Sequence, residues 1–291
     1  MKRIGIATDS HSGITPKEAK ELGIMVLPMP FYIGEECYYE EVSLTRTTFF
    51  ERLNAGEKVS TSQPSPESLM DFWREGLKEY EQIVYIPMSS GLSGSCGTAM
   101  MLATEDEFEN KVFVVDNGRV STPLHRSVLD ALELAEGGYS AERIKAILEE
   151  EKEKMSIYIA VETLEFLKRG GRISAGTAAI GTLLNIKPVL KLGISVLETF
   201  KKSRGMKKAK KEMLEALKKD METTFKEYYD KGEIYLLAAT SADESTTQEW
   251  VEEIKAFFPG MEVLCDNLTL GISCHVGEGG LGIGCSCRPK R

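Results

Sequence analysis

Residues 83–95 of the chain have the sequence IVYIPMSSGLSGS, and this stretch decides the fold class. An apolar run, Ile83–Met88, is followed by a loop of serine and glycine and then by a helical pattern that begins near Ser93. The same order of apolar run, polar loop and helix starts at Ile4 and again at Val112. Strands that alternate with helices form a parallel sheet with helices on both faces. The first half therefore predicts a Rossmann-like α/β lobe.

The second half is less regular. After a charged helix expected over 141–154, we predict strands at 157–161, 188–192, 194–197, 234–240 and 261–265, and helices at 175–184, 206–230 and 244–258. The two strands around Gly193 indicate a hairpin, so a mixed or antiparallel sheet is expected in this α/β lobe. A chain of 291 residues exceeds the usual size of one core. We predict two domains, 1–155 and 156–291.

Composition and charge exclude several classes of protein. The formal net charge of -9 argues against a general nucleic-acid binder, which needs clustered lysine and arginine. The basic stretch 201–211, KKSRGMKKAKK, is more simply explained as the solvated start of a helix. No segment approaches the roughly 20 apolar residues of a membrane span. The first ten residues, MKRIGIATDS, predict a strand and not a signal peptide, so we expect a cytoplasmic protein.

The cysteine pattern favours ordinary reduced thiols. Six cysteines are spread over a chain without a signal sequence, which argues against a disulfide framework. Cys274, His275, Cys285 and Cys287 are close in sequence but lack the C-x-x-C pair of typical zinc sites. We predict no metal and no cofactor.

Three polar segments are candidates for binding a small anion. Thr8-Asp9-Ser10 ends the first strand, and Ser89–Ser95 leads from a strand into a helix, where hydroxyl groups and backbone N–H groups can hold phosphate or carboxylate. The stretch 60–66, STSQPSP, also leads into a helix and is stiffened by its prolines. A plain helix cap explains each loop about as well. Neither the dinucleotide-binding glycine motif nor the P-loop motif is present.

Histidine is scarce, and no catalytic group is evident. His11, His125 and His275 are the only three, and none has a neighbouring serine or cysteine in a recognised catalytic pattern. His275 precedes the glycine-rich stretch 277–282 and could donate a hydrogen bond to an anion, although a lone histidine is more often structural. The sequence therefore contains side chains that can bind an anion, but no recognisable set of catalytic residues.

Taken together, these motifs resemble the DegV family. The resemblance runs over nearly the whole chain, in the order TDS at 8–10, TSQPS at 61–65, SSGLSGS at 89–95, LKRGGRIS at 167–174, LNIKPVL at 184–190, RG at 204–205 and HVG at 275–277. Glu278 departs from the family pattern, in which proline or serine is frequent. Such proteins have two α/β domains with a fatty acid between them.

The resemblance implies a role for particular residues. The carboxylate of a long-chain fatty acid would be bound by Thr61, Ser62, Ser93, Gly94 and His275. Ile180, Leu183, Leu184 and Ile186 would line the acyl tail, although core packing is the likelier role for any one of them. Arg172 and Arg204 would contact a separate ATP-dependent fatty acid kinase, which makes an acyl phosphate from the presented acid.

Three classes of function follow. The first is a monomeric, non-catalytic carrier subunit that presents its fatty acid to the kinase, in service of phospholipid metabolism. The second is a lipid transport or sensing protein without a kinase partner. The third is an enzyme acting on a small substrate, since the family fold is related to a dihydroxyacetone kinase subunit.

Overall fold

The first half of the chain forms a parallel four-stranded sheet. The computed structural model describes residues 2–40, 42–178, 186–193 and 196–290. The strands are ordered β2-β1-β6-β7, and all three pairings are parallel. Their bounds are β1 Lys2–Asp9, β2 Met25–Leu27, β6 Tyr80–Ile86 and β7 Val112–Val114. The expected Rossmann-like parallel lobe is confirmed.

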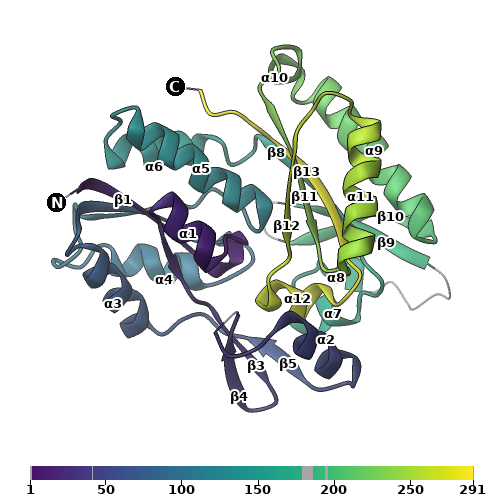
Figure 1. The fold of residues 1–291 in the computed structure, drawn as a ribbon, viewed down its shortest axis with the longest axis horizontal. Helices are drawn as coiled ribbons and strands as arrows, with labels where there is room; N and C mark the ends of the chain where they lie inside the picture. Colours follow the sequence, from purple (N-terminus) through teal and green to yellow (C-terminus); the bar gives the residue numbers. More distant parts are fainter. Residues whose placement is uncertain (1, 41, 179–185, 194–195, 291) are drawn as a thin grey trace.

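Helices cover both faces of this sheet (Figure 1). One core contains residues of α1, α5 and α6, and the other contains residues of α3 and α4. The helices are α1 Pro16–Leu22, α3 Pro66–Gly76, α4 Ser95–Leu102, α5 Thr122–Glu136 and α6 Ala141–Glu150, with a short 3-10 turn, η1, at Ser10–Ser12. α3 ends at Gly76, because Tyr80 is already paired with Lys2 at the start of β6.

A small antiparallel sheet was not predicted. It has the order β4-β3-β5, with β3 at Pro30–Ile33, β4 at Glu36–Tyr39 and β5 at Val59–Thr61. The helix α2, Arg46–Asn54, supplies Phe49 and Phe50 to its core, and Leu270 and Cys274 of the second half complete that core. The neighbouring strands β2 and β3 therefore belong to two different sheets.

The second half forms a six-stranded mixed sheet with the order β10-β9-β8-β13-β11-β12. Every pairing is antiparallel except β11 with β12. The strands are β8 Met155–Ala160, β9 Ile186–Leu192, β10 Leu197–Arg204, β11 Ile234–Thr240, β12 Val263–Asn267 and β13 Leu281–Cys287. The mixed sheet confirms the predicted fold class, and the antiparallel β9–β10 pair confirms the expected strand pairing around Gly193. The domain division 1–155 and 156–291 stays a prediction.

The helices of the second half are α7 Glu165–Gly170, α8 Ala175–Ala178, α9 Met206–Thr223, α10 Lys226–Asp230, α11 Glu244–Phe257 and α12 Leu270–Val276. Neither α7 nor α12 was predicted. The prediction for the basic stretch 201–211 was wrong for its first four residues, which belong to β10, whereas the helix starts at Met206 as predicted. β10 is an edge strand, and charged side chains on an edge oppose unwanted strand pairing. None of the helices in the described ranges has the length and apolar character needed to cross a bilayer.

Candidate functional site

A cavity of about 220 Å³ lies between the two halves of the chain. Its walls come from the loops after β5 and β6, from the start of α5, from α12 and from one face of the six-stranded sheet. Polar side chains gather where the loops of the first half meet α12, and apolar side chains line the sheet. The cavity is therefore polar at one end and apolar along the sheet.

Thr61 and His275 meet at the polar end. Thr61 ends β5, and His275 lies in the last turn of α12, which packs against β5. The Thr61 hydroxyl oxygen lies 2.9 Å from His275 Nε2, a hydrogen-bonding distance. Two residues separated by 214 positions thus form one polar pair in the cavity wall.

The position of His275 depends on a glycine of α7. A Cβ atom placed on Gly170 would lie 2.0 Å from His275 Nδ1, so a side chain at this position would displace the ring. His275 Nδ1 is buried and has no hydrogen-bond partner. The G-G-R-I motif therefore has a structural reason to begin with glycine here.

The serine loop places Ser93 and Gly94 beside this pair. Ser93 is half-buried and lines the cavity; its hydroxyl oxygen accepts a hydrogen bond from the backbone N–H of Ser95 (3.2 Å). Gly94 precedes the first residue of α4, where unsatisfied N–H groups and the helix dipole favour an anion. Ser62 also lines the cavity. All five residues expected to bind a carboxylate thus lie in one cavity wall.

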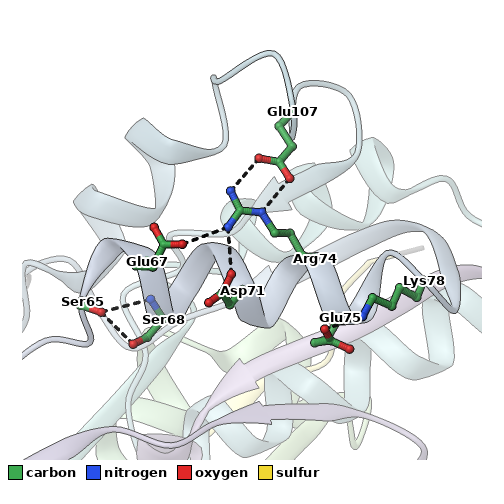
Figure 2. Close-up of polar contacts among 8 residues, drawn as sticks. All are labelled: Ser65, Glu67, Ser68, Asp71, Arg74, Glu75, Lys78 and Glu107. Carbon is green, nitrogen blue, oxygen red and sulfur yellow. Dashed lines mark hydrogen bonds and ion pairs between the residues drawn. The ribbon is translucent and has the colours of Figure 1, made fainter.

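Both loops lead into helices that are fixed to the first lobe. Ser65 caps α3 by accepting a hydrogen bond from the backbone N–H of Ser68 (3.1 Å). Figure 2 shows this cap. It also shows Arg74, further along α3, which donates two hydrogen bonds to Glu107 in the segment after α4 (2.8 and 2.9 Å). Gln63 links its loop to α4, because its Oε1 accepts a hydrogen bond from the Thr98 hydroxyl of that helix (3.3 Å). The two loops are held relative to each other before any ligand arrives.

Arg172 connects the second half to the serine loop. Its Nε donates to the Leu92 carbonyl (3.2 Å) and its Nη1 to the Gly170 carbonyl (2.5 Å). It also lines the cavity, whereas Arg204 is exposed at the end of β10. The two arginines expected at a partner surface thus differ in position, and of the two only Arg172 lines the cavity.

A second histidine, His11, lies in the cavity wall and was not predicted as a site residue. Burial, with a smaller contribution from the positive charge of Arg172, lowers the pKa of His11 to about 4. The same causes, in the same order, lower the pKa of His275 to about 4. Both imidazoles are therefore neutral at pH 7, and Arg172 supplies the positive charge of the site.

The Thr8-Asp9-Ser10 motif holds the strand ends together. The buried Asp9 carboxylate accepts hydrogen bonds from the backbone N–H groups of His11 (2.9 Å) and Met88 (2.8 Å). Thr8 donates to the Ile86 carbonyl (2.7 Å). Burial raises the pKa of Asp9 to about 6, partly offset by those two backbone hydrogen bonds. The motif fixes the loops that carry the site and does not itself line the cavity.

Two rows of residues on the six-stranded sheet form an apolar trough. The first row is Ile159, Gly282 and Ala239, and the second is Ile157, Gly284 and Leu237, in both cases from β8, β13 and β11 in register. Alternate residues of a strand face the same side, so both glycines lie on the cavity side. The absence of side chains at the two glycines leaves the centre of the trough open.

The structure describes only one of the four predicted tail residues. Ile180, Leu183 and Leu184 fall outside the described residues. Ile186 is the first residue of β9 and does not line the cavity. The glycine alternation of 281–287, LGIGCSC, is the sequence signal that could have identified the trough.

Glu278 and the C-terminal cysteines also have defined surroundings. The Glu278 carboxylate accepts a hydrogen bond from Asn54 of α2 (2.6 Å). Cys274, Cys285 and Cys287 are buried free thiols, and burial raises the pKa of Cys274 and Cys287 to about 12. The described residues contain no group of three or more histidine, cysteine or acidic side chains able to hold a metal ion.

The comparison with known families agrees with this architecture. A family model described as an uncharacterised protein of the DegV family matches residues 3–287. The chain belongs to the DegV family. A DegV domain-containing protein of Halalkalibacterium halodurans is 30% identical over 285 residues, which covers 97% of this chain and 98% of the relative.

Two solved structures of DegV proteins are similar over their full length. One, described as a fatty-acid-binding DegV family protein from Thermus thermophilus, has a TM-score of 0.86 and 34% identity, with 98% of this chain and 99% of that chain covered. The other, described as DegV, a fatty acid binding protein from Bacillus subtilis, has a TM-score of 0.83 and 31% identity, with 99% and 100% covered. The DegV fold thus accounts for the two sheets.

Proposed function

We propose that this chain binds one long-chain fatty acid in the cavity between its two sheets and presents the carboxyl group to a separate ATP-dependent fatty acid kinase. The observation that carries the proposal is the polarity of the cavity: hydroxyl groups and imidazoles at one end, and an apolar trough along the sheet. A fatty acid has the same distribution of polarity. The fatty-acid-binding descriptions of the two DegV structures support the choice of ligand.

The head group would be bound by directed hydrogen bonds. If His275 Nε2 donates to Thr61, the threonine hydroxyl hydrogen is free to donate to a carboxylate oxygen. The Gly94 N–H would supply a further donor, and Arg172 would balance the charge. The hydroxyl groups of Ser62 and Ser93 donate to the Gln63 carbonyl and to Ser95 Oγ in this structure, and they would turn to the carboxylate on binding. A hydrogen bond to a charged group stabilises a complex by about 1.5–3 kcal/mol.

The tail would supply most of the affinity. Each buried methylene contributes about 0.8 kcal/mol, so a sixteen-carbon chain could contribute on the order of ten kcal/mol before ordering costs. The trough over Gly282 and Gly284 is the path that leads away from the polar end. One chain supplies this whole lining, so we propose a monomer that carries one acid.

We call Thr61, Ser62, Ser93, Gly94 and His275 the head-group clamp. This clamp suits a carrier better than a catalyst. Hydroxyl groups and neutral imidazoles can bind a carboxylate and afterwards remain bonded to the acyl phosphate, without a direct ion pair to lysine. The activating reaction would then belong to the kinase. We propose that Arg172 and the exposed Arg204 contact that partner, with Arg172 also facing the head group.

Two experiments test the proposal. Native mass spectrometry of the purified protein should detect a bound long-chain acid, and Thr61→Val should weaken binding of palmitic acid about 10- to 150-fold. Full binding by both Thr61→Val and Ser93→Ala would contradict the head-group assignment. Incubation with a fatty acid kinase and ATP should give an acyl phosphate. Its absence while the acid stays bound would favour a transport or sensing protein instead.

A further inference from the structure

Two polar side chains line the cavity outside the head-group clamp. His11 of η1 and Ser121, directly before α5, are each 6% exposed and both belong to the cavity wall. The backbone N–H of Ser121 donates to the His11 carbonyl (2.9 Å), so the two residues are held side by side. We call them the His11–Ser121 pair.

Neither side chain of the pair has a hydrogen-bond partner. His11 Nδ1 is buried and lies 3.6 Å from Asp9 Oδ1, which is too long for a hydrogen bond. Ser121 Oγ is also buried and unpartnered, whereas the next residue, Thr122, donates its hydroxyl hydrogen to the Ala238 carbonyl (2.7 Å). Buried polar groups are nearly always paired in native proteins, so the unpartnered Ser121 Oγ indicates a missing partner in the cavity. His11 Nδ1 faces Asp9, and it is Nε2 of the same ring that packs against the cavity residue Gly271.

The backbone at Ser121 is strained. Its φ of 55° and ψ of -141° lie in a region that residues other than glycine seldom adopt. Such strain persists where the surrounding structure imposes it, and it is concentrated at ligand-binding positions. The strained conformation keeps the Ser121 side chain in the cavity wall.

The pair lies close to the head-group clamp. His11 Nε2 packs on Gly271 of α12, where an added Cβ would be 2.6 Å away. Gly271 and His275 are four residues apart on the same helix face, which separates them by about 6 Å. A molecule anchored at His275 would therefore meet the pair within its first few carbon atoms.

The chemistry of the pair selects a hydroxyl group. The pKa of His11, lowered to about 4, keeps its imidazole neutral, with one donor and one acceptor nitrogen. Ser121 can also donate and accept. A methylene satisfies neither group, and a second carboxylate would face the acceptor nitrogen. A hydroxyl both donates and accepts.

On the basis of the fatty-acid site proposed above, we infer that the His11–Ser121 pair binds a hydroxyl group on the acyl chain near the carboxyl end. The ligand class is a fatty acid hydroxylated within its first few carbons. His11 and Ser121 are then specificity-determining residues, and the trough holds the rest of the chain.

The test compares matched acids on the full-length protein. Dissociation constants are measured by calorimetry for palmitic acid, β-hydroxypalmitic acid and ω-hydroxypalmitic acid, the last carrying its hydroxyl at the far end. We expect the wild type to bind the β-hydroxy acid about tenfold more tightly than palmitic acid, as one added hydrogen bond implies. The ω-hydroxy acid should show no such gain.

Variants of the pair complete the test. His11→Phe and Ser121→Ala should each abolish the preference for the β-hydroxy acid, while Ser245→Ala, at an exposed serine of α11, should keep it. Should Ser121→Ala fail to fold, Ser121→Gly suits the positive φ and serves instead. Equal affinity of the wild type for the β-hydroxy acid and for palmitic acid would overturn this inference but not the proposed function. Failure of all three acids to bind would overturn the proposed function.

Discussion

The trough over β8, β13 and β11 makes a quantitative prediction about chain length. Ile157, a partly buried residue of its second row, faces the cavity beside Gly284. Ile157→Phe places a larger side chain in that row and leaves the first row, with Ile159, unchanged. We expect it to shorten the acyl chain that the cavity accepts.

The structure sets the size of this effect. The two rows are two residues apart along antiparallel strands, which is about 6.8 Å. That length accommodates roughly five methylene groups, given carbon–carbon bonds of ~1.5 Å. At about 0.8 kcal/mol for each methylene, complete exclusion from the second row costs at most about 4 kcal/mol, or about a thousandfold in affinity.

The assay is a series of saturated acids of increasing length, measured by calorimetry on each variant. In the wild type, affinity should rise by a constant factor per carbon until the trough is filled. In Ile157→Phe the rise should stop roughly five carbons earlier, with short acids bound as in the wild type. Ile157→Leu conserves volume and is the matched control. An equal loss at every length, or no change at any length, would refute the proposed path of the tail.

Three further perturbations have defined outcomes. Gly170→Ala should displace the His275 ring and weaken palmitic acid binding as much as His275→Ala does; unchanged affinity would show that the ring is not needed. Acid binding should raise the pKa of His275 from about 4, so calorimetry in buffers of different ionisation enthalpy should show proton uptake and tighter binding as pH falls towards 5. Burial alone would lower the pKa of His125, but its hydrogen bond to Asp266 (3.1 Å) and nearby carboxylates raise it. This histidine therefore stabilises the fold below pH 6.5 and loses that contribution as pH rises through the raised pKa. His125→Gln should weaken the dependence of the free energy of unfolding on pH in this range. An unaltered dependence on pH would refute the assignment.

The parallel lobe could be predicted because its strands are nearly continuous apolar runs. Ile83–Ile86 is buried at every position, and its loop and helix follow in the expected order. A strand in a sheet that is covered on both faces is apolar at nearly every position, and this continuous apolar run is easy to recognise in a sequence. The small sheet gave no such signal, since Glu36–Tyr39 is mostly exposed and Val59–Thr61 has only three residues.

The site could be predicted only in part. The loops that carry Thr61 and Ser93 could be recognised by their hydroxyl groups, and His275 by its place before a glycine-rich stretch. The family resemblance brought the three together at one carboxylate. The helix that carries His275 was missed because its seven residues are too few to show a helical period and most of them are buried. His11 was missed for a different reason: its surroundings come from Gly271, which is brought beside it only by the tertiary fold.

The most direct test of the central claim is a crystal structure with a long-chain fatty acid that carries bromine on its last carbon. We expect a carboxylate within hydrogen-bonding distance of Thr61, Ser93 or His275. We also expect an anomalous bromine peak at or beyond the row of Ile157, Gly284 and Leu237. A bromine peak outside this cavity, or a carboxylate at the apolar end, would contradict this claim.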